Sequence, residues 1–411
     1  MRTIHLLRKF DRAEWGGTET AVERLLEGLR EIGVETVVYG PQTEHGPDND
    51  APGVRRYRAF LPIVGLSAQR RRQLVSVGGN LMSWDLPCSL WKEKGADLIH
   101  THTLGRLGGI ARQIARRRRI PFVVSIHGGV LDLPQKVRQE FNAPVSGGWE
   151  WGKIFGWFLG ARLLFRDADC ILTCNEREAA LLRKSHPKKR VAVQPHGVPL
   201  DFYQQDHRLA ARAAFPQIVE RDLLLCVGRI DPIKNQGWLV EQASAVLQKH
   251  PKALLVLAGP CTDEPYGDLL RRKIRELGLE GRIVLTGGLP SNDPRLIGLM
   301  QEARAVLLPS RSETFGLVVL EAWAAGAVVV SSRTSGPSAL IRDGENGWFF
   351  SLEEPSEFHT AVDGVLKKPA LARHMAEHGA EVSRQYGLRA LAKRLSKLYE
   401  ELVQEKRPCA T

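Results

Sequence analysis

The most informative stretch of the sequence runs from Pro309 to Gly326 and reads PSRSETFGLVVLEAWAAG. It follows a short apolar run, Arg304 to Leu308, which is typical of a buried strand that ends at a proline and serines. The order strand, loop, helix predicts a helix that begins near Gly316, where unpaired backbone N–H groups and the positive end of the helix dipole favour an anion. Glycine at this point lets a ligand approach the backbone closely.

Two glutamates flank the predicted anion site. Glu313 lies in the loop before the Phe315-Gly316 step, and Glu321 lies in the helix. Carboxylates on both sides of a phosphate-sized site suit the hydroxyl groups of a nucleotide sugar, which carries a hexose at one end and a ribose at the other. The alternative is a surface loop glutamate and a solvated helix glutamate. Glu321, however, interrupts the apolar run LVVLEAWAA, where an unpaired charge would be unfavourable, so the functional interpretation is favoured.

The composition is that of a globular protein with room for two domains. The chain has 411 residues, of which 43% are hydrophobic and 25% are charged. No apolar run approaches the ~20 residues that span a membrane, and the first apolar stretch is too short for a secretory signal. The six cysteines form no C-x-x-C pair, which favours free thiols in a reducing cytoplasm and predicts no zinc site. We therefore expect a cytoplasmic protein.

The positive charge is concentrated in the first half of the chain. The net charge is +12, and residues 1–200 carry 31 Lys and Arg against 20 Asp and Glu. Four basic runs supply much of this excess: Arg55-Arg56, Arg70 to Arg72, Arg116 to Arg119 and Lys188 to Arg190. Such a face suits an anionic membrane, an acidic carbohydrate or a nucleic acid. For any single run a solvated surface is the alternative, but for the whole half we expect a polyanionic neighbour.

Residues 1–198 are predicted to form an N-terminal domain with a parallel, doubly wound sheet. Arg2 to Leu7 and Val34 to Tyr39 have the composition of strands, and the segment between them has apolar residues at helical spacing. This β-α-β opening predicts parallel strands. Gly16-Gly17 at the turn before the helix would bring backbone N–H groups towards a phosphate or a sugar oxygen, although a plain turn is the alternative.

His127 is the candidate ligand-binding histidine of this domain. It directly follows the predicted strand Pro121 to Ile126, and ligands of doubly wound sheets gather at the carboxyl ends of strands. The alternative is a ring that bonds only a loop carbonyl. His100 and His102 alternate along another predicted strand end, and we expect them to be structural. Residues 40–95 show no clean periodicity and predict an irregular excursion with a few edge elements.

Residues 145–166 form an aromatic-rich segment that includes Trp149, Trp151 and Trp157. Trp151, Phe158 and neighbouring apolar residues fall on one helical stripe, with arginines nearby. Such a stripe can lie in a membrane interface, although more often it is core, and interrupting glycines weaken the helix. Core, acceptor site and membrane contact stay open for this segment.

Residues 199–385 are predicted to form a second domain of the same class, because the alternation of strands and helices restarts at Leu223. Arg229 and Lys234 follow its first strand and lie at a predicted ligand-binding edge. Bidentate and point-charge contacts from these residues suit a diphosphate, while two solvated loop cations are the alternative. A last helix, about 386–405, has apolar residues at helical spacing and is expected to pack on a domain.

Glu313 and Glu321, with seven residues between them, resemble the E-x7-E motif of GT-B glycosyltransferases of the retaining family 4 type. The resemblance extends from Gly16-Gly17 to the segment DGENG at residues 343–347, and so covers most of the chain. It implies two Rossmann-like domains that face each other across a cleft. It also implies that the nucleotide sugar binds mainly to the second domain, that the last helix packs back on the first, and that transfer retains the anomeric configuration.

The resemblance also implies roles for individual residues. A glycine loop that matches Gly16-Gly17 reaches the donor in this family, and a histidine that matches His127 lies beside the transferred sugar. The expected donor-site residues are Gly16, Gly17, Arg229, Lys234, Leu289, Glu313, Phe315, Gly316, Leu317 and Glu321, and the expected catalytic residues are His127, Arg229, Lys234 and Glu313. Arg229 and Lys234 match the phosphate-binding pair and Leu289 the segment at the base. We assign sugar hydroxyls to Glu313 and the ribose to Glu321.

The expected activity is transfer of a hexose-type sugar from a UDP- or GDP-linked donor to a glycan or lipid-linked acceptor, in cell-surface polysaccharide or glycolipid synthesis. No D-x-D pair is placed to hold a divalent ion, so we expect metal-independent transfer without a cofactor. A peripheral contact with the inner face of an anionic membrane is the further expectation. The alternatives are a GT-B epimerase acting on a nucleotide sugar and a non-enzymatic polyanion-binding protein, although no nucleic-acid motif is recognised.

Overall fold

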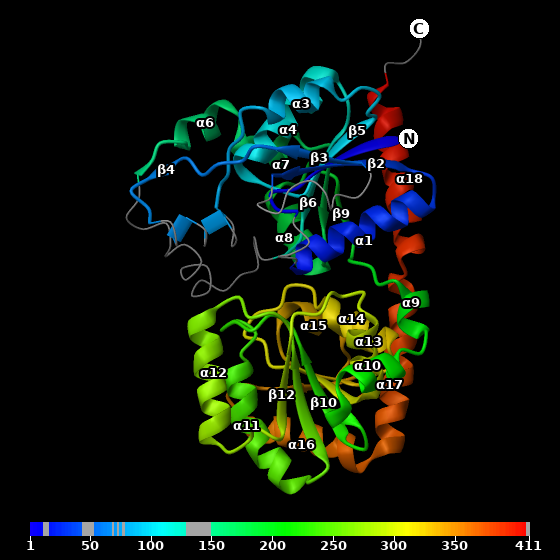
Figure 1. Cartoon of the computed structure of the whole chain (residues 1–411). Helices are drawn as coiled ribbons and strands as arrows, with labels where there is room; N and C mark the ends of the chain where they lie inside the picture. Colours follow the sequence, from blue (N-terminus) through cyan, green and yellow to red (C-terminus); the bar gives the residue numbers. More distant parts are fainter. Residues whose placement is uncertain are drawn as a thin grey trace. The chain divides into compact units, whose positions relative to one another are not determined.

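The computed structural model describes residues 1–10, 16–42, 53–67, 70–71, 74–75, 79–128 and 149–407. The chain divides into two compact units, Met1–His196 with Arg389–Thr411, and Gly197–Leu388 (Figure 1). Each unit contains a parallel sheet with helices on its faces, so the predicted α/β class with two Rossmann-like sheets is confirmed. Residues 129–148, which include the first four residues of the aromatic-rich segment 145–166, lie outside the described residues.

The first unit has a seven-stranded sheet in the order β3-β2-β1-β5-β6-β8-β9, in which every pair is parallel. Its strands are β1 Arg2–Leu6, β2 Glu35–Pro41, β3 Val54–Tyr57, β5 Leu98–Thr101, β6 Phe122–Ile126, β8 Cys170–Thr173 and β9 Val191–Val193. Its helices include α1 Gly17–Glu31, α3 Leu86–Lys92, α4 Gly105–Arg118, α6 Lys153–Phe158, α7 Leu164–Asp167 and α8 Glu176–Ser185. The excursion at 40–95 contributes the edge strand β3, helix α3 and strand β4 (Ile63–Val64), which pairs with β7 (Trp149–Glu150).

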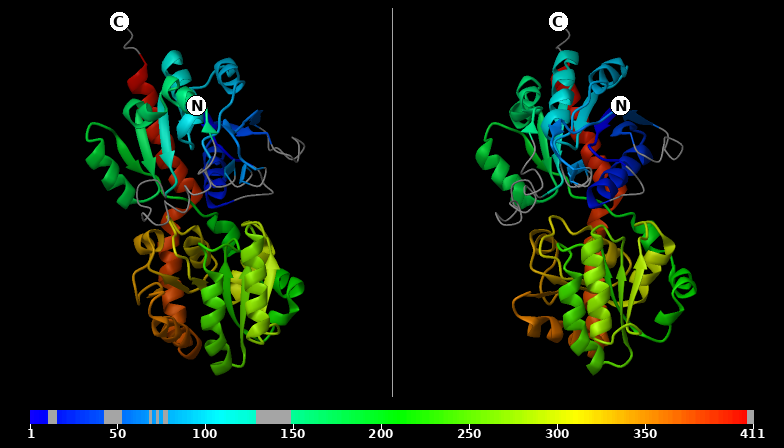
Figure 2. Two further views of the ribbon diagram at one scale, coloured as in Figure 1. Left: turned by 90° about the vertical axis from the view of Figure 1, so that its left-hand side faces the viewer. Right: turned by 60° about the vertical axis from the view of Figure 1, so that its left-hand side comes forward.

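The last helix, α18 (Leu388–Lys406), covers one face of this sheet, and its residues from Arg389 onward belong to the first unit. Leu395, Tyr399 and Leu402 are buried in one cluster with Leu98 and Val123 of strands β5 and β6. Two different views show the helix running beside these strands (Figures 1 and 2). Alternate strand residues face the other side, where they pack with α3, α4 and α7.

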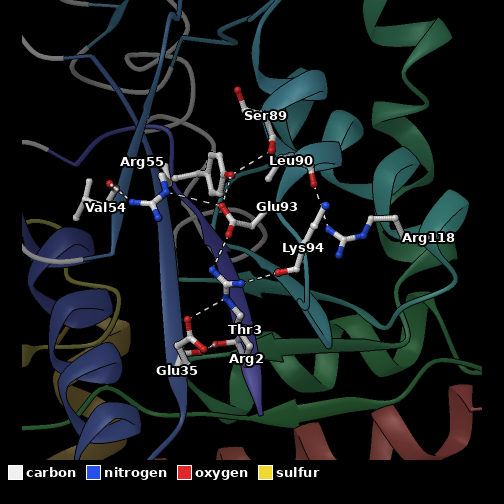
Figure 3. A network of polar contacts seen from close by, with 11 residues as sticks. Arg2, Thr3, Glu35, Val54, Arg55, Ser89, Leu90, Glu93, Lys94 and Arg118 are labelled. Carbon is white, nitrogen blue, oxygen red and sulfur yellow. Dashed lines mark hydrogen bonds and ion pairs between the residues drawn. The ribbon is translucent and has the colours of Figure 1, made fainter.

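Arg2 joins three segments at the amino end of the first sheet (Figure 3). Its guanidinium donates to the Lys94 carbonyl at 2.6 Å and pairs with Glu93 at 2.6 Å and Glu35 at 3.0 Å. Glu93 also accepts from the Tyr39 hydroxyl at 2.8 Å, and burial together with this bond raises the pKa of Tyr39. This network fixes the segment after α3 against β1 and β2, although the sequence between residues 40 and 95 shows no clear pattern.

The second unit has a six-stranded sheet in the order β12-β11-β10-β13-β14-β15, again parallel throughout. Its strands are β10 Asp222–Val227, β11 Ala253–Ala258, β12 Ile283–Gly287, β13 Ala303–Leu308, β14 Val329–Ser332 and β15 Trp348–Phe350. Its helices are α9 Leu200–Gln204, α10 Arg208–Ala214, α11 Gln236–Lys249, α12 Glu264–Glu276, α13 Pro294–Glu302, α14 Leu317–Ala324, α15 Ser335–Leu340, α16 Pro355–Lys367 and α17 Pro369–Ser383. Alternate strand residues such as Leu224, Leu255 and Leu307 form one core with α11, α12 and α16.

Helix α14 is anchored from behind by its tryptophan. Trp323 is fully buried, and its indole N–H donates to the Asn346 carbonyl at 3.0 Å. Gly379 of α17 lies so close to this ring that a Cβ atom there would stand 2.3 Å from Trp323 Cδ1. The two helices therefore meet without an intervening side chain, and this contact holds the helix that carries Glu321.

No helix in the described part of the chain is both long and apolar enough to cross a membrane.

Replacing Gly379 by alanine is expected to destabilise the second unit by about 1–3 kcal/mol, because the added methyl group would overpack the Trp323 ring. Chemical denaturation followed by tryptophan fluorescence measures this change. Gly156→Ala is the matched control, because a methyl group at this helical position has only an ordinary contact with Arg106. An equal loss of stability in both variants would contradict the packing argument.

Candidate functional site

The order of strands in the second unit places two loops at one ligand-binding edge. The sheet begins at β10, and β11 and β12 are added on one side of it while β13 and β14 are added on the other. In doubly wound sheets the crevice at such a reversal, outside the carboxyl ends of the strands, is where ligands bind. The loops that follow β10 and β13 carry Arg229, Lys234 and Glu313, three of the residues predicted from sequence.

Backbone and side-chain hydrogen bonds join these two loops. The Arg311 N–H donates to the Ile233 carbonyl at 2.8 Å, and the Asn235 side chain donates to the Pro309 carbonyl at 3.2 Å. Lys234 Nζ and Glu313 Oε2 consequently form an ion pair. Their side chains are 22% and 21% exposed, so the pair is only partly shielded from solvent. The structure therefore brings together a predicted phosphate-binding cation and a predicted sugar-binding carboxylate.

Asp231 organises the first of these loops, although it is not among the site residues predicted from the sequence. Its Oδ1 accepts from the N–H groups of Ile233 at 2.9 Å and Lys234 at 3.0 Å, which is an Asx-type turn. Its Oδ2 lies 3.2 Å from an Arg229 guanidinium nitrogen. The turn thereby sets the direction of Lys234, and the ion pair restrains the half-exposed Arg229.

Three strand-end loops meet backbone to backbone at this edge. A Cβ atom at Gly259, after β11, would lie 2.0 Å from the Gly228 carbonyl oxygen, after β10. The Gly259 N–H donates to the Gly287 carbonyl at the end of β12 at 3.0 Å. Leu289 follows on this third loop and is half-buried. Leu289, the residue predicted to contact the base, therefore lies on the loop after β12. That loop is bonded to the loop after β11, which packs against Gly228, next to Arg229.

Helix α14 begins where the sequence predicts. Gly316 is its N-cap, with a φ of 86° that a non-glycine residue rarely adopts, and Leu317 is its first residue. Phe315 is buried, and Gly336 packs so closely on it that a Cβ atom would lie 2.5 Å from the Phe315 backbone. The loop is therefore rigidly placed before the helix.

The two glutamates of the motif occupy different environments. The Glu313 carbonyl accepts from the Gly336 N–H at 2.8 Å and the Ser335 hydroxyl at 3.1 Å, so its backbone is fixed while its carboxylate pairs with Lys234. Glu321 is only 4% exposed on α14, as its position in an apolar run indicates. Glu313 lies in the loop after β13, and Glu321 lies on α14, the helix to which that loop leads.

The remaining predicted site residues lie in the first unit. Gly16 is the N-cap of α1, and its N–H donates to the Glu19 carboxylate at 3.0 Å; Gly17 is the first residue of that helix. One backbone donor expected to reach a ligand is therefore bonded within the helix. His127 follows β6 directly, and burial lowers its pKa to about 4.

His100 and His102 are buried, and both nitrogens of each ring have hydrogen-bond partners. His100 Nδ1 lies 2.6 Å from the Tyr399 hydroxyl and its Nε2 lies 2.6 Å from Ser125 Oγ. His102 Nδ1, however, lies 2.9 Å from His127 Nε2, a contact that sequence reasoning missed because the two residues follow different strands. His5 and His196 also join this group, and no signal in a single sequence marks them.

The chain matches known families over both units. Residues 209–382 match the family described as "Glycosyl transferases group 1", and residues 16–223 match the family described as "Glycosyl transferase 4-like domain". The D-inositol 3-phosphate glycosyltransferase of Mycolicibacterium paratuberculosis is 31% identical over 76% of this chain and 69% of that protein. D-inositol 3-phosphate glycosyltransferase 2 of Catenulispora acidiphila is 28% identical over 95% of this chain and 91% of that protein.

A solved structure shares the fold of the chain. The crystal structure of Anabaena HepE in complex with UDP and glucose has a TM-score of 0.72 and 16% identity, and the match covers 98% of this chain and 100% of that one. That likeness shows the GT-B fold. The two family matches and the 31% identical relative show that the chain is an enzyme that belongs to the group 1 glycosyltransferases, of the family 4 type.

Proposed function

We propose that this chain transfers a hexose-type sugar from a UDP-linked donor to an acceptor that carries phosphate, with retention and without a metal. The observation that carries the donor half is the ion pair between Lys234 and Glu313 at the reversal of strand order, beside Arg229 and the start of α14. A cation and a carboxylate in contact suit the point where a phosphate joins a hydroxyl-bearing sugar. The likeness to HepE, a protein crystallised with UDP and glucose, supports a uridine donor.

In this proposal the cations act on the leaving group. As the bond to the sugar breaks, negative charge grows on the diphosphate, and donors fixed at that point stabilise the transition state more than the ground state. Lys234 and Arg229 supply positive charge, and the first N–H groups of α14, after Gly316, supply a helix dipole. Glu313 holds sugar hydroxyls, Glu321 the ribose, and the loop of Leu289 the base. The roles of His127, Gly16 and Gly17 in the first unit stay predictions.

The acceptor is proposed to be anionic. The two relatives described above are named for D-inositol 3-phosphate, and the first half of this chain carries most of the excess positive charge. Several members of the basic runs bond within the unit: Arg56 donates to the Phe10 and Pro41 carbonyls, and Arg190 pairs with Glu401. Arg117 and Arg119, at the end of α4, are exposed. Because the end of α4 leads into the start of β6, these two arginines lie at the amino edge of the sheet, opposite His127. The anionic acceptor is therefore supported by the names of the relatives and by the net charge of this half, not by these two residues.

In the described part of the aromatic-rich segment, residues 149–166, some aromatic side chains pack against the first unit and others are exposed to solvent. Trp151 and Phe155 pack against Phe60 and Trp84, at ring distances of 5.3–6.2 Å. On the other side of α6 the described large apolar side chains are exposed: Ile154, Trp157 and Phe158, together with Trp149 before the helix. Lys153 and Arg162, which are close to this apolar patch in the sequence, are exposed as well. An exposed apolar patch near basic residues supports a peripheral contact with an anionic membrane. A lipid-linked acceptor would place the reaction in glycolipid or cell-surface polysaccharide synthesis, whereas a free phosphorylated polyol would not.

Lys234→Ala and Glu313→Ala are each expected to lower kcat for a UDP-sugar by about 10² to 10³, because each removes a fixed contact to the reacting group. Steady-state turnover with product analysis measures the loss, and incubation with donor alone tests for an epimerised sugar. Lys249→Ala is the matched control, because Lys249 pairs with Asp363 between α11 and α16, away from the strand-end loops. Near wild-type rates for Lys234→Ala and Glu313→Ala would remove the donor-site assignment.

Thermal denaturation with nucleotide sugars tests the base. A ligand that binds only the folded state raises its melting temperature. UDP-sugars are expected to raise the Tm of the wild type more than GDP- or ADP-sugars at equal concentration, and Lys234→Ala is expected to abolish the difference. A larger shift with GDP- or ADP-sugars would refute the uridine donor while leaving the diphosphate site intact.

Co-sedimentation with vesicles tests the membrane contact. The chain is expected to bind anionic vesicles at low salt, to bind neutral vesicles weakly, and to lose affinity when Trp157 and Phe158 are both changed to serine. Leu209→Ser is the control, because Leu209 is 79% exposed on α10 in the second unit. Binding that does not depend on lipid charge or salt would contradict the membrane proposal.

Turnover measured with D-inositol 3-phosphate, with unphosphorylated inositol and with a phosphate-linked lipid distinguishes the possible acceptors.

A further inference from the structure

A line of buried polar side chains runs across three neighbouring strands of the first unit and ends at His127. Thr3 and His5 lie on β1, His102 follows β5, and His127 follows β6. Thr3 Oγ1 lies 3.0 Å from His5 Nε2, His5 Nδ1 lies 3.0 Å from His102 Nε2, and His102 Nδ1 lies 2.9 Å from His127 Nε2. His127 Nδ1 is buried and has no hydrogen-bond partner among the described residues. The line, here called the histidine relay, therefore has one open end.

The members of the histidine relay are neutral at physiological pH. Burial lowers the pKa of His5 to about 3 and that of His127 to about 4, and it lowers the pKa of His102 well below its usual value. A neutral imidazole has one N–H donor and one acceptor nitrogen. Each ring in the relay must therefore accept on one nitrogen and donate from the other, so that the whole relay has only two possible directions.

Thr3 decides between these directions. Its hydroxyl lies 3.3 Å from the Glu35 carbonyl oxygen, to which it donates. A hydroxyl has one proton, so Thr3 must then accept from the Nε2–H of His5. By the same step His5 Nδ1 accepts from His102 Nε2–H, and His102 Nδ1 accepts from His127 Nε2–H. The proton of His127 is thus on Nε2, and its open Nδ1 carries a lone pair.

We propose that Thr3, His5 and His102 are positioning residues that hold His127 as its Nε2–H tautomer, so that Nδ1 accepts a hydrogen bond from a hydroxyl group of the bound sugar. The identity of this ligand rests on the proposed function, whereas the tautomer does not. The relay works over 124 residues of sequence, from Thr3 to His127, because β1, β5 and β6 are adjacent in the sheet. A protonated Nδ1 could not accept from the hydroxyl and could only donate to its oxygen, so the tautomer decides the direction of this hydrogen bond.

A metal ion is the competing interpretation of this cluster. One nitrogen from each of His5, His100 and His102 lies within 4.8 Å of the others, a spacing that could hold an ion. Every ring nitrogen of these three residues, however, already lies within hydrogen-bond distance of a protein group: Thr3, His102, Tyr399, Ser125, His5 or His127. Binding an ion through one nitrogen of each ring would break at least two of these contacts. The histidine relay, together with the contacts of His100 to Tyr399 and Ser125, leaves all of them intact.

Nitrogen NMR of the ligand-free, full-length chain, with ¹⁵N-labelled histidine, tests the relay directly. In the wild type His127, assigned with the His127→Gln variant, is expected to show a protonated Nε2 and an unprotonated Nδ1. Thr3→Val removes the acceptor that orients the relay. Without that acceptor, the Nε2–H of His5 would be a buried donor with no partner. If all the hydrogen bonds of the relay reverse direction, His5 Nε2 has only an unpaired lone pair, and the proton of His127 is expected to move to Nδ1. The Thr3→Ser variant keeps the hydroxyl group, so His127 is expected to have the same tautomer as in the wild type.

Thr101→Val is the matched control, because Thr101 is equally buried on β5 but donates to the Thr103 carbonyl and not to the relay. A protonated Nδ1 in the wild type, or an unchanged His127 tautomer in folded Thr3→Val, would overturn the proposal. Histidine signals that change on treatment with a chelator would overturn it in favour of a metal site. In turnover, Thr3→Val is expected to lower kcat/KM for a UDP-sugar by about tenfold. The expected tautomers with unchanged turnover would uphold the relay and reject the sugar hydroxyl as its ligand.

Discussion

The reversal of strand order in each parallel sheet is the constraint on which the polar chemistry of this chain depends. In the second unit the reversal lies between β10 and β13, and in the first it lies between β1 and β5. Right-handed crossovers send the connecting helices to opposite faces at these points, so the loops diverge and leave a crevice at the carboxyl edge. The Lys234–Glu313 pair lies at one reversal, and the contact of His5 with His102 lies at the other.

Much of this arrangement could be predicted from the sequence, because it depends on order along the chain. Strands that alternate with helices give a parallel sheet, and a polar residue just after a strand must then lie at the carboxyl edge. That rule places Arg229, Lys234, Glu313 and His127 without any knowledge of which strands are neighbours. The start of α14 at Gly316 follows from local sequence alone. The roles of these residues toward a ligand stay predictions.

The remainder could not be predicted, because it depends on which distant segments become adjacent. His5 and His102 are 97 residues apart, and Tyr399 reaches His100 from a helix 299 residues away. His5 looks like an ordinary residue of a short strand until β1 and β5 are paired. Composition also misleads: several arginines of the basic runs bond to carbonyls and carboxylates of their own unit, so net charge overstates the positive surface. Asp231 shows the same limit, since only the folded turn reveals its three contacts.

Depth below the surface explains why the two reversals use different chemistry. In the second unit Lys234 and Glu313 are each about one-fifth exposed, so water and the opposite charge share the task of stabilising them. At the reversal in the first unit His5 is fully buried, and an ionised group there would lose its hydration without a counter-ion. Neutral imidazoles avoid that cost, because each can donate and accept in one line. The buried histidines at the first sheet's edge can therefore fix the direction of a hydrogen bond but cannot hold a charge. The more exposed edge of the second sheet can hold the charges that bind a diphosphate.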